Sequence, residues 1–410
     1  MVVCCTCCSS DDVTDDDERL RLPRSPTSRP LLRMRWGRAS PDESKATLLE
    51  GGVVFKFAAG RYTLCSEVGR GAHCVVWRCL RVSKLGEPRT FALKVHVEET
   101  AAFKREEAAL KALSSASTSI GLPELFPRLI GNVRVQGRTG LAMPLFGPDL
   151  YVLQKLRERR PFPTPFVWSV ATQLLHALEV LDRCGLVHAD IKPQNVVLHS
   201  PDHHAPLTFE TRITLIDLGS CLTSEQLGAH NKRITYVQSR WYRAPEVLLW
   251  SPISNAADAW SVGCVIAEVA LGVPLLPGES EYNQLCRITA LLGPPPDSLL
   301  ERSRRADHFF ILDERSGQLS LNTERASVEP PLIRYLPHDD FASVLTHLIP
   351  SLAAFERDAL LVLLDGLLDW EPNERWAGSR LLERLDEELG ATHPGGRDGD
   401  FDNAAEVERL

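Results

Sequence analysis

Residues 188–195 read HADIKPQN and bring four chemically different side chains into one short loop. Asp190 can accept a hydrogen bond from an attacking hydroxyl group and take its proton. Lys192 can neutralise charge on a phosphoryl group, and Asn195 offers a carboxamide oxygen to a divalent cation. His188 is interpreted as a packing and hydrogen-bonding residue rather than as an acid or base. The loop therefore holds several parts of a site for phosphoryl transfer.

A second candidate ligand for a cation follows in the stretch TLIDLGS. Its apolar residues predict a strand that ends at Asp217. A carboxylate that projects from a strand end suits Mg²⁺, a hard cation that prefers oxygen ligands. In-line phosphoryl transfer depends mainly on positioning and electrostatic stabilisation. One base, one ammonium group and two oxygen ligands would supply both.

The segment before the loop supplies candidates for phosphate binding. VGRGAHCVV places Gly69 and Gly71 in a predicted hairpin, where the missing Cβ atom lets backbone N–H groups approach a phosphate. Glycines also mark ordinary turns, so this pair alone is weak evidence for phosphate binding and needs support from other motifs. Lys94 lies within the apolar strand FALKV. The alternative for Lys94 is an edge position from which its ammonium group reaches solvent.

A buried Lys94 would need a counter-charge, because an unpaired ammonium group is costly to bury. The next predicted helix offers Glu106 and Glu107. We favour Glu106, because Leu110 and Leu113 follow it by four and seven positions and therefore share its helix face.

The order of the predicted elements indicates an α+β fold. From Tyr62 the runs RYTLCSEV, CVVWRCLRV and RTFALKVHV predict an antiparallel sheet. KREEAALKALSS predicts a helix that ends in a serine-rich loop, and two further strands follow it. After Pro148 helices take over, and DAWSVGCVIAEVALG is apolar nearly all round, as in a buried central helix. Strands followed by helices predict two unequal lobes with a cleft between them.

The two ends of the chain differ from this pattern. Residues 1–58 have no sustained period and are predicted to be a disordered extension, whose arginines could also form a nuclear-import or docking patch. Residues 391–410 form an acidic, glycine-rich tail. The first residues, MVVCCTCC, allow three readings, namely a disordered tail, a palmitoylation site or part of a metal site. The first is favoured, because no second Cys/His pair lies at zinc-like spacing.

Composition excludes several classes of function. The chain has 410 residues, of which 44% are hydrophobic and 24% charged, and a net charge of −8. That charge gives no reason to expect a nucleic acid partner. The longest apolar stretch is interrupted by Glu268 and Pro274, which predicts no membrane span. Without a secretory signal at its start, we expect the protein inside the cell, in the nucleus, the cytoplasm or both.

Six motifs occur in the order, and on the types of element, of one known family. They are GRGAHCVV, FALK, HADIKPQN, DLG, APE and DAWSVG. One of them alone would be weak support, whereas six in order are specific. The chain thus resembles the eukaryotic protein kinases over roughly residues 60–390. The resemblance implies the two-lobed kinase fold, ATP as phosphoryl donor and Mg²⁺ as cofactor.

The resemblance also implies domain limits. A kinase domain would span residues 59–390, with an N-lobe at 59–143, a hinge at 144–148 and a C-lobe at 149–390. Its family motifs assign catalysis to Asp190, Lys192 and Asn195, and metal binding to Asn195 and Asp217. They assign cofactor binding to Val68, Gly69, Gly71, Val76, Ala92, Lys94, Glu106, Met143, Leu145 and Val197.

Further positions carry over from the family in the same way. Met143 would be the gatekeeper beside the adenine pocket, with Pro144–Phe146 as the hinge. Glu246 should pair with Arg375, and Asp258 should brace the catalytic loop.

Within the family the chain is most similar to the CMGC group. YVQSRWYRAPEVLL and the long stretch from GVPLLPGESEYNQL resemble the dual-specificity tyrosine-regulated kinases and their Yak-type and homeodomain-interacting relatives. GPDLY is also similar to the CDC-like kinases. The resemblance implies protein substrates in which Ser or Thr is followed by Pro. We expect a monomer.

Ala189 replaces the arginine with which most family members grip a phosphate on the activation segment. The dual-specificity group instead phosphorylates a tyrosine of its own, which an arginine then holds. Tyr236 occupies the matching place, with Arg240 as its partner, whereas Ile234 replaces the first tyrosine of the usual pair. The resemblance therefore predicts self-phosphorylation of Tyr236. The alternative is that Tyr236 packs as a neutral ring.

Two further positions depart from the family pattern. Cys74 replaces the third glycine of the phosphate loop, where its bulk could loosen phosphate contact or its thiol could respond to oxidation; an inert thiol is the favoured reading. Gln194 stands where close relatives carry glutamate, so preference for an arginine upstream of the phosphoacceptor should be weaker.

Two other functions compete with a protein kinase. A pseudokinase would use the same fold as a binding scaffold. Such proteins usually lack one or more of five family residues for catalysis and nucleotide binding, and this chain keeps all five. A small-molecule kinase is disfavoured by the complete stretch from APE onward. The five residues are Lys94, Glu106, Asp190, Asn195 and Asp217.

Overall fold

The computed structural model describes most of the chain between residues 51 and 376. The described residues are 51–58, 60–71, 74–82, 90–96, 100–120, 124–201, 204–228, 237–312, 319–322, 336, 340–350 and 352–376. The cysteine cluster, the acidic tail and Tyr236 lie outside these residues, so the predictions made for them stay predictions.

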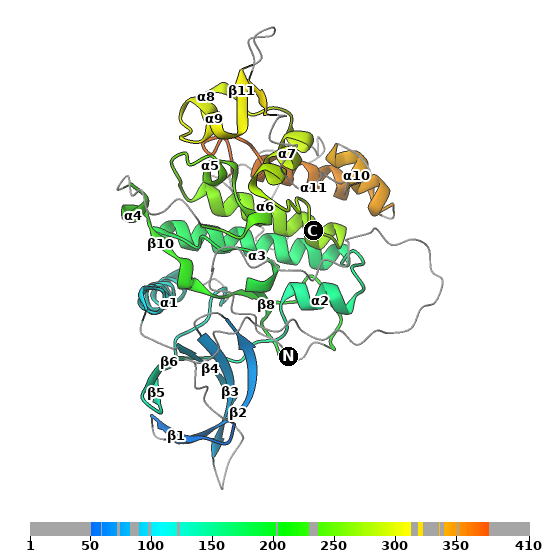
Figure 1. Cartoon of the computed structure of the whole chain (residues 1–410). Helices are drawn as coiled ribbons and strands as arrows, with labels where there is room; N and C mark the ends of the chain where they lie inside the picture. Colours follow the sequence, from blue (N-terminus) through cyan, green and yellow to red (C-terminus); the bar gives the residue numbers. More distant parts are fainter. Residues whose placement is uncertain are drawn as a thin grey trace.

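One lobe is an antiparallel sheet of six strands in the order β1-β2-β3-β4-β6-β5. Figure 1 shows this sheet at one end of the molecule, with helix α1 (Ala101–Ile120) beside it. Lys94 faces Val76 on one neighbouring strand and Leu141 on the other, so it lies inside the sheet and not at an edge. The strands are β1 (Val54–Phe57), β2 (Gly60–Arg70), β3 (Cys74–Val82), β4 (Thr90–His96), β5 (Gly131–Val135) and β6 (Arg138–Met143).

The sheet begins earlier in the chain than the predicted domain start at residue 59. Strand β1 pairs antiparallel with β2, so the last residues of the predicted extension belong to the folded lobe. The reason is aromatic packing: Phe55 is buried, and Tyr62 and Phe91 stack edge to face with ring centroids 4.9 Å apart. Phe57 lies against both of these rings. A strand of four residues whose partners come later in the chain gives little periodic signal of its own.

Helix α1 also differs from the prediction, because it continues through the serine-rich stretch to Ile120. The hydroxyl of Ser114 donates to the carbonyl oxygen of Leu110, one turn earlier, at 2.7 Å. Such a bond lets serine stay inside a helix. The apolar face of the helix, including Leu110 and Leu113, is buried in the core.

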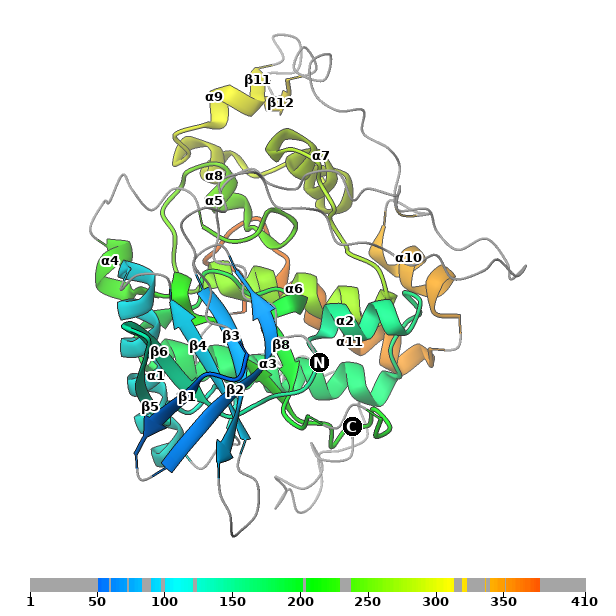
Figure 2. The same cartoon turned by 60° about the horizontal axis from the view of Figure 1, so that its bottom comes forward.

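The second lobe is mainly helical, which confirms the predicted two-lobed α+β fold (Figures 1 and 2). Short strands pair as β7 (Leu186–Val187) with β10 (Leu222–Thr223), β8 (Val196–Leu198) with β9 (Ile213–Leu215), and β11 (Phe310–Leu312) with β12 (Leu319–Leu321). The helices are α2 (Leu150–Leu156), α3 (Thr164–Arg183), α4 (Ser224–Gly228), α5 (Pro245–Leu248), α6 (Ala256–Leu271), α7 (Glu281–Leu292), α8 (Asp297–Glu301), α9 (Ala306–Phe309), α10 (Phe341–Leu348) and α11 (Ala354–Leu367).

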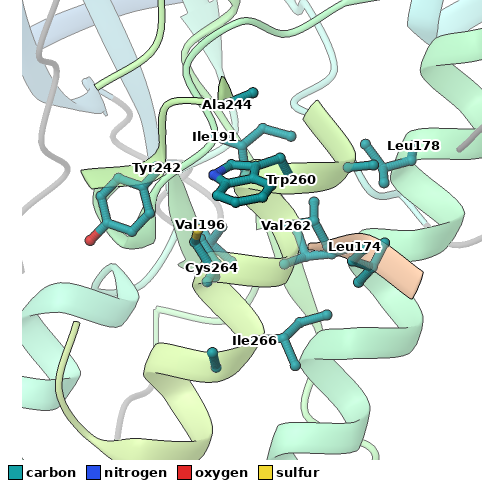
Figure 3. Close-up of a cluster of buried hydrophobic side chains, with 14 of the residues drawn as sticks. Leu174, Leu178, Ile191, Val196, Tyr242, Ala244, Trp260, Val262, Cys264 and Ile266 are labelled. Atoms are coloured by element: carbon teal, nitrogen blue, oxygen red, sulfur yellow. The ribbon is translucent and has the colours of Figure 1, made fainter. Parts of the chain in front are cut away.

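Helix α6 is the centre of this lobe, as its uniformly apolar sequence predicts, and all its residues are buried. Figure 3 shows Trp260 of α6 in one cluster with Leu174 and Leu178 of α3, and with Ile191 of the catalytic loop and Ala244 before α5. The loop that carries the chemistry is therefore anchored directly in the largest core.

Gly272 ends α6 in the left-handed conformation, with φ of +78°, and its N–H group donates to Glu268 O at 2.8 Å. A Cβ atom here would collide with the backbone at Arg159, so this helix end requires glycine. Among the described residues, no helix is both long and apolar enough to cross a membrane.

Candidate active site

The catalytic loop is held from below by Asp258 of α6. Its two carboxylate oxygens accept hydrogen bonds from the backbone N–H groups of His188, at 2.5 Å, and Ala189, at 3.0 Å. Burial raises the pKa of Asp258, and these two donors oppose that rise. The side chain of His188 contacts Ile216 O through Nε2 at 3.0 Å. These contacts confirm that Asp258 braces the loop and that His188 serves packing and hydrogen bonding.

The alanine between the histidine and the catalytic aspartate has an unusual backbone. Ala189 adopts φ of +62° and is buried, and its carbonyl oxygen accepts from Gln238 N at 3.0 Å. A non-glycine residue in this conformation is uncommon and persists only where its surroundings hold it. The contact ties the catalytic loop to the segment that follows the activation region.

Asp190 lies in a closed set of hydrogen bonds. Lys192 Nζ contacts Asp190 Oδ2 at 2.8 Å, and Ser239 Oγ donates to Asp190 Oδ1 at 2.8 Å. Lys192 Nζ also donates to Ser239 Oγ at 3.0 Å. The amide nitrogen of Asn195 donates to the backbone oxygen of Asp190 at 2.8 Å. These bonds fix the orientation of the carboxylate and bring the three predicted catalytic side chains together.

The second half of the site joins the two lobes. Lys94 Nζ of β4 lies 2.7 Å from Glu106 Oε1 of α1 and 2.8 Å from Asp217 Oδ1, and all three side chains are buried. The structure thus contains the expected pair with Glu106. Glu107 instead pairs with Lys111 on the surface. Burial opposes ionisation of Asp217, but the charge and hydrogen bond of Lys94 outweigh it, so the pKa of Asp217 is lowered.

Two oxygens in this region suit a divalent cation. Asp217 has φ of +67°, which turns the chain just after β9, and its Oδ2 has no hydrogen-bond partner among the described residues. Asn195 uses its amide nitrogen in the loop, and its buried Oδ1 is likewise without a partner there. Carboxylate and carboxamide oxygens are ligands that Mg²⁺ prefers. The residues present therefore fit the predicted cation.

A cavity opens beside these groups, with about 390 Å³ of atom-free space that includes open solvent. Lys94, Glu106 and Asp217 form its polar wall, and Met143 and Pro144 its hinge side. The remaining lining residues are Val76, Ala92, Pro127, Phe146 and Ile216.

Other predicted cofactor residues lie next to the residues that line this cavity. Val68 and Val197 belong to the apolar cluster that also holds Val76 and Ala92, and Leu145 packs against that cluster. Gly69 faces Val76 across the β2–β3 pair.

The structure around the turn between β2 and β3 helps to decide whether Cys74 is inert or obstructs phosphate binding. The N–H group of Gly71 donates to Cys74 O at 2.9 Å, while the tip of the turn, residues 72–73, lies outside the described residues. The side chain of Cys74 is buried in the apolar cluster with Val68 and Val76. This burial favours an inert thiol over one that obstructs phosphate.

Sequence reasoning missed two polar residues of the site. Ser239 contacts both Asp190 and Lys192, but a single serine at the start of SRWYR gives no periodic signal. Asp149 caps α2 directly after the hinge, where its Oδ1 accepts from Val152 N at 2.8 Å. Burial raises the pKa of Asp149 to about 6, opposed by backbone N–H donors and by Lys155. Asp149 could have been predicted as a helix cap, because aspartate is a preferred residue directly before a helix.

Arg240, the predicted regulatory arginine, lies next to Ser239 and is near the protein surface. Arg240 is partly exposed and its Nη1 donates to Glu279 O at 2.6 Å. Its Nε has no hydrogen-bond partner among the described residues. Gln194, the other departure from the family pattern, is partly buried, and its Oε1 also lacks a partner there.

Comparison with known proteins agrees with this geometry. Residues 62–385 match the protein kinase domain family, so the chain belongs to that family.

The relatives found by sequence comparison indicate which group of protein kinases the chain is most similar to. The chain is 30% identical over 335 residues to the serine/threonine-protein kinase ppk15 of Schizosaccharomyces pombe, covering 77% of this chain and 60% of the relative. It is 31% identical to homeodomain-interacting protein kinase 1 of Caenorhabditis elegans, covering 65% and 30%. It is 40% identical over 170 residues to human dual specificity tyrosine-phosphorylation-regulated kinase 3, covering 42% and 27%. The predicted resemblance to this group is confirmed, although the chain spans only part of each relative's length.

Proposed function

We propose that the protein is an ATP- and Mg²⁺-dependent protein kinase that phosphorylates Ser and Thr. The proposal rests on two sets of buried polar side chains. Lys94, Glu106 and Asp217 form ion pairs on the wall of the cavity. Asp190, Lys192 and Asn195 are bonded to one another in the catalytic loop. Its family membership supports the same activity.

Each group has a role that its contacts support. Lys94, oriented by Glu106, would bind the nucleotide phosphates. Asp190, fixed by Ser239 and Lys192, would accept the hydrogen bond of the incoming hydroxyl and hold its proton. Lys192 is placed to offset charge on the transferred phosphoryl group. Mg²⁺ held by Asn195 and Asp217 would neutralise phosphate charge. The apolar wall around Val76 and Ala92 would cover the adenine and exclude water.

The preference for proline after the phosphoacceptor is part of the proposal. Gln238 adopts φ of +64°, and its carbonyl oxygen accepts from Arg243 Nη2 at 2.8 Å. A substrate residue packed here would find this acceptor already engaged, so its own N–H group would lose water without compensation. Proline has no N–H group and avoids that cost.

The arginine that occupies this carbonyl is itself held in place. Arg243 Nη1 lies 3.1 Å from Glu281 Oε1, and the other oxygen of Glu281 contacts Arg305 at 2.8 Å. Arg305 stacks over the rings of Trp250 and Phe309. These contacts support a rigid recognition surface beside Asp190.

Self-phosphorylation of Tyr236 is proposed on the family resemblance and on the place of Arg240. Arg240 follows Tyr236 by four positions and is partly exposed, and a guanidinium group is a strong partner for phosphate. Mass spectrometry of the bacterially expressed protein, with an Asp217→Asn sample as control, tests this step. Full activity with unmodified Tyr236 would refute it.

The activity itself is tested with matched peptides that differ only in Ser-Pro against Ser-Ala. The proposal predicts Mg²⁺-dependent transfer with a clear preference for Ser-Pro, and Arg243→Leu should reduce that preference. Binding of nucleotide without any transfer would instead favour a scaffold role.

A further inference from the structure

A second basic side chain faces the glutamate of helix α1. His96 follows Lys94 by two positions on β4, so both side chains lie on the same face of the strand. It is only 2% exposed, and its Nε2 lies 3.5 Å from Glu106 Oε2. Neither ring nitrogen of His96, nor Glu106 Oε2, has a hydrogen-bond partner among the described residues. Nε2 of His96 and Oε2 of Glu106, two buried atoms without such a partner, therefore face each other.

The arrangement divides the two oxygens of Glu106 between two partners. Oε1 contacts Lys94 Nζ at 2.7 Å, and Oε2 faces the imidazole of His96. The same ring packs edge to face on Phe103, with centroids 5.1 Å apart, one turn earlier on α1. Both of these side-chain contacts are with α1, and they join that helix to β4.

An apolar residue would fill the same space, but it would leave Oε2 of Glu106 buried with no donor near it. Buried polar groups are costly unless they are hydrogen-bonded, so a histidine whose nitrogen faces an otherwise unmatched carboxylate oxygen suggests a polar contact with a purpose. We propose that His96 is a positioning residue, whose Nε2–H group holds Oε2 of Glu106 and so keeps Oε1 directed at Lys94.

The need for a second contact follows from how Lys94 is shared. Its ammonium group already contacts Glu106 and Asp217, at 2.7 and 2.8 Å. Under the proposed function, on which this inference rests, nucleotide phosphates add a third claim on the same group. His96 keeps the carboxylate of Glu106 fixed while Lys94 turns toward the phosphates. Arg105 supports the same docking of α1, because its Nε donates to Gly219 O at 3.1 Å.

The test compares two variants of the full chain that differ in hydrogen bonding. His96→Leu keeps an apolar side chain of similar size and removes the donor, whereas His96→Gln restores an N–H donor of similar reach. Steady-state kinetics would vary ATP and peptide separately. The shift in melting temperature caused by MgADP would report nucleotide binding without catalysis, and melting without nucleotide would report folding.

For His96→Leu we expect kcat/KM for ATP to fall about tenfold, because Glu106 is left with a buried oxygen and no donor. The KM for the peptide should stay within about twofold, since the peptide contacts neither residue, and the MgADP shift should shrink. His96→Gln should restore both quantities to within about threefold of the unmodified protein, which loss of packing alone would not allow.

Two results would overturn the inference. His96→Leu could match the unmodified protein in kcat/KM for ATP, or the two variants could fall equally. If the unmodified protein transferred no phosphate, the proposed function would fail. The MgADP shift would then decide the role of His96, and the absence of any shift in all three proteins would reject it.

Discussion

Two buried ion pairs, one in each lobe, are bonded very differently. In the helical lobe Arg375 binds Glu246 through two parallel bonds of 2.8 and 2.6 Å, and its three nitrogens also reach the backbone oxygens of Asp369, Ala256 and Trp370. In the cleft Lys94 binds one oxygen of Glu106 and one of Asp217, while the other oxygen of each has no hydrogen-bond partner among the described residues.

The difference separates a pair that holds the fold from one that is prepared for a ligand. Glu246 and Arg375 have no polar atom left over, and they fix α5 to the end of the helical lobe. Glu106 and Asp217 keep buried oxygens that a histidine and a cation would satisfy. Buried polar atoms without partners call for an explanation. In this cleft we attribute the unpaired oxygens of Glu106 and Asp217 to the proposed contact with His96 and to binding of a cation.

The largest effect is expected from Asp190→Asn. The amide keeps the size and most hydrogen bonds of the side chain but cannot take a proton. We expect kcat to fall by about 10³-fold, within the usual range for a general base. The melting temperature should change little, and a radiolabelled transfer assay beside a melting curve would measure both. A loss of less than about tenfold would contradict the role of Asp190.

Glu246→Gln should have the opposite profile. It leaves the guanidinium group of Arg375 buried without its counter-charge, which costs about 3–5 kcal/mol of unfolding free energy. Denaturant titration would measure the loss. The KM for ATP of the protein that remains folded should be nearly unchanged. An Arg375→Met, Glu246→Leu double variant should recover much of the stability, because it removes both charges together.

Asp149 is the intermediate case, a buried carboxylate whose Oδ2 has no hydrogen-bond partner among the described residues. Burial raises its pKa from 3.8 to about 6, so the folded protein binds its proton more tightly than the unfolded chain does. The stability linked to that proton is present below about pH 4 and is lost as pH rises through about 6. Asp149→Asn keeps the helix cap and does not titrate.

The stability gained by Asp149→Asn should therefore grow between pH 4 and pH 6 and level off above, at up to about 3 kcal/mol. Denaturant titrations at pH 4.5 and pH 7.5 would measure it. A gain that is equal at both values would show that burial of charge is not the cause.

The smallest effect is expected at Cys74, on the apolar wall of the cleft. Cys74→Gly removes a buried side chain from the start of β3 and should cost about 1–2 kcal/mol. It should not lower the KM for ATP, because the side chain is buried in the apolar cluster with Val68 and Val76. A KM several-fold lower would restore the idea that this side chain obstructs the loop.

Local patterns were enough to predict much of the site. The choice of Glu106 over Glu107 followed from the apolar face of one helix, and the burial of α6 followed from its composition. The positions of Asp258, Glu246 and Arg375 came from the family resemblance.

The features that sequence reasoning missed depend on contacts between distant segments. Strand β1 is stabilised by aromatic rings of β2 and β4, Ser239 meets Asp190 across nearly fifty residues, and Ile216 lines the cavity from a strand end. The hydroxyl bond of Ser114 back to Leu110 keeps α1 helical where composition predicts a loop. None of these features produces a periodic pattern of apolar residues within one segment, so sequence patterns do not predict them.

Asp217→Asn is the most direct test of the cation site, because it removes one charge and alters neither the size of the side chain nor the burial of its neighbours. Mg²⁺-dependent nucleotide binding and phosphoryl transfer would be measured beside the melting temperature, at several Mg²⁺ concentrations. If Asp217 holds the cation, the variant should stay folded but lose phosphoryl transfer and the Mg²⁺ dependence of nucleotide binding. Unchanged turnover would contradict that assignment.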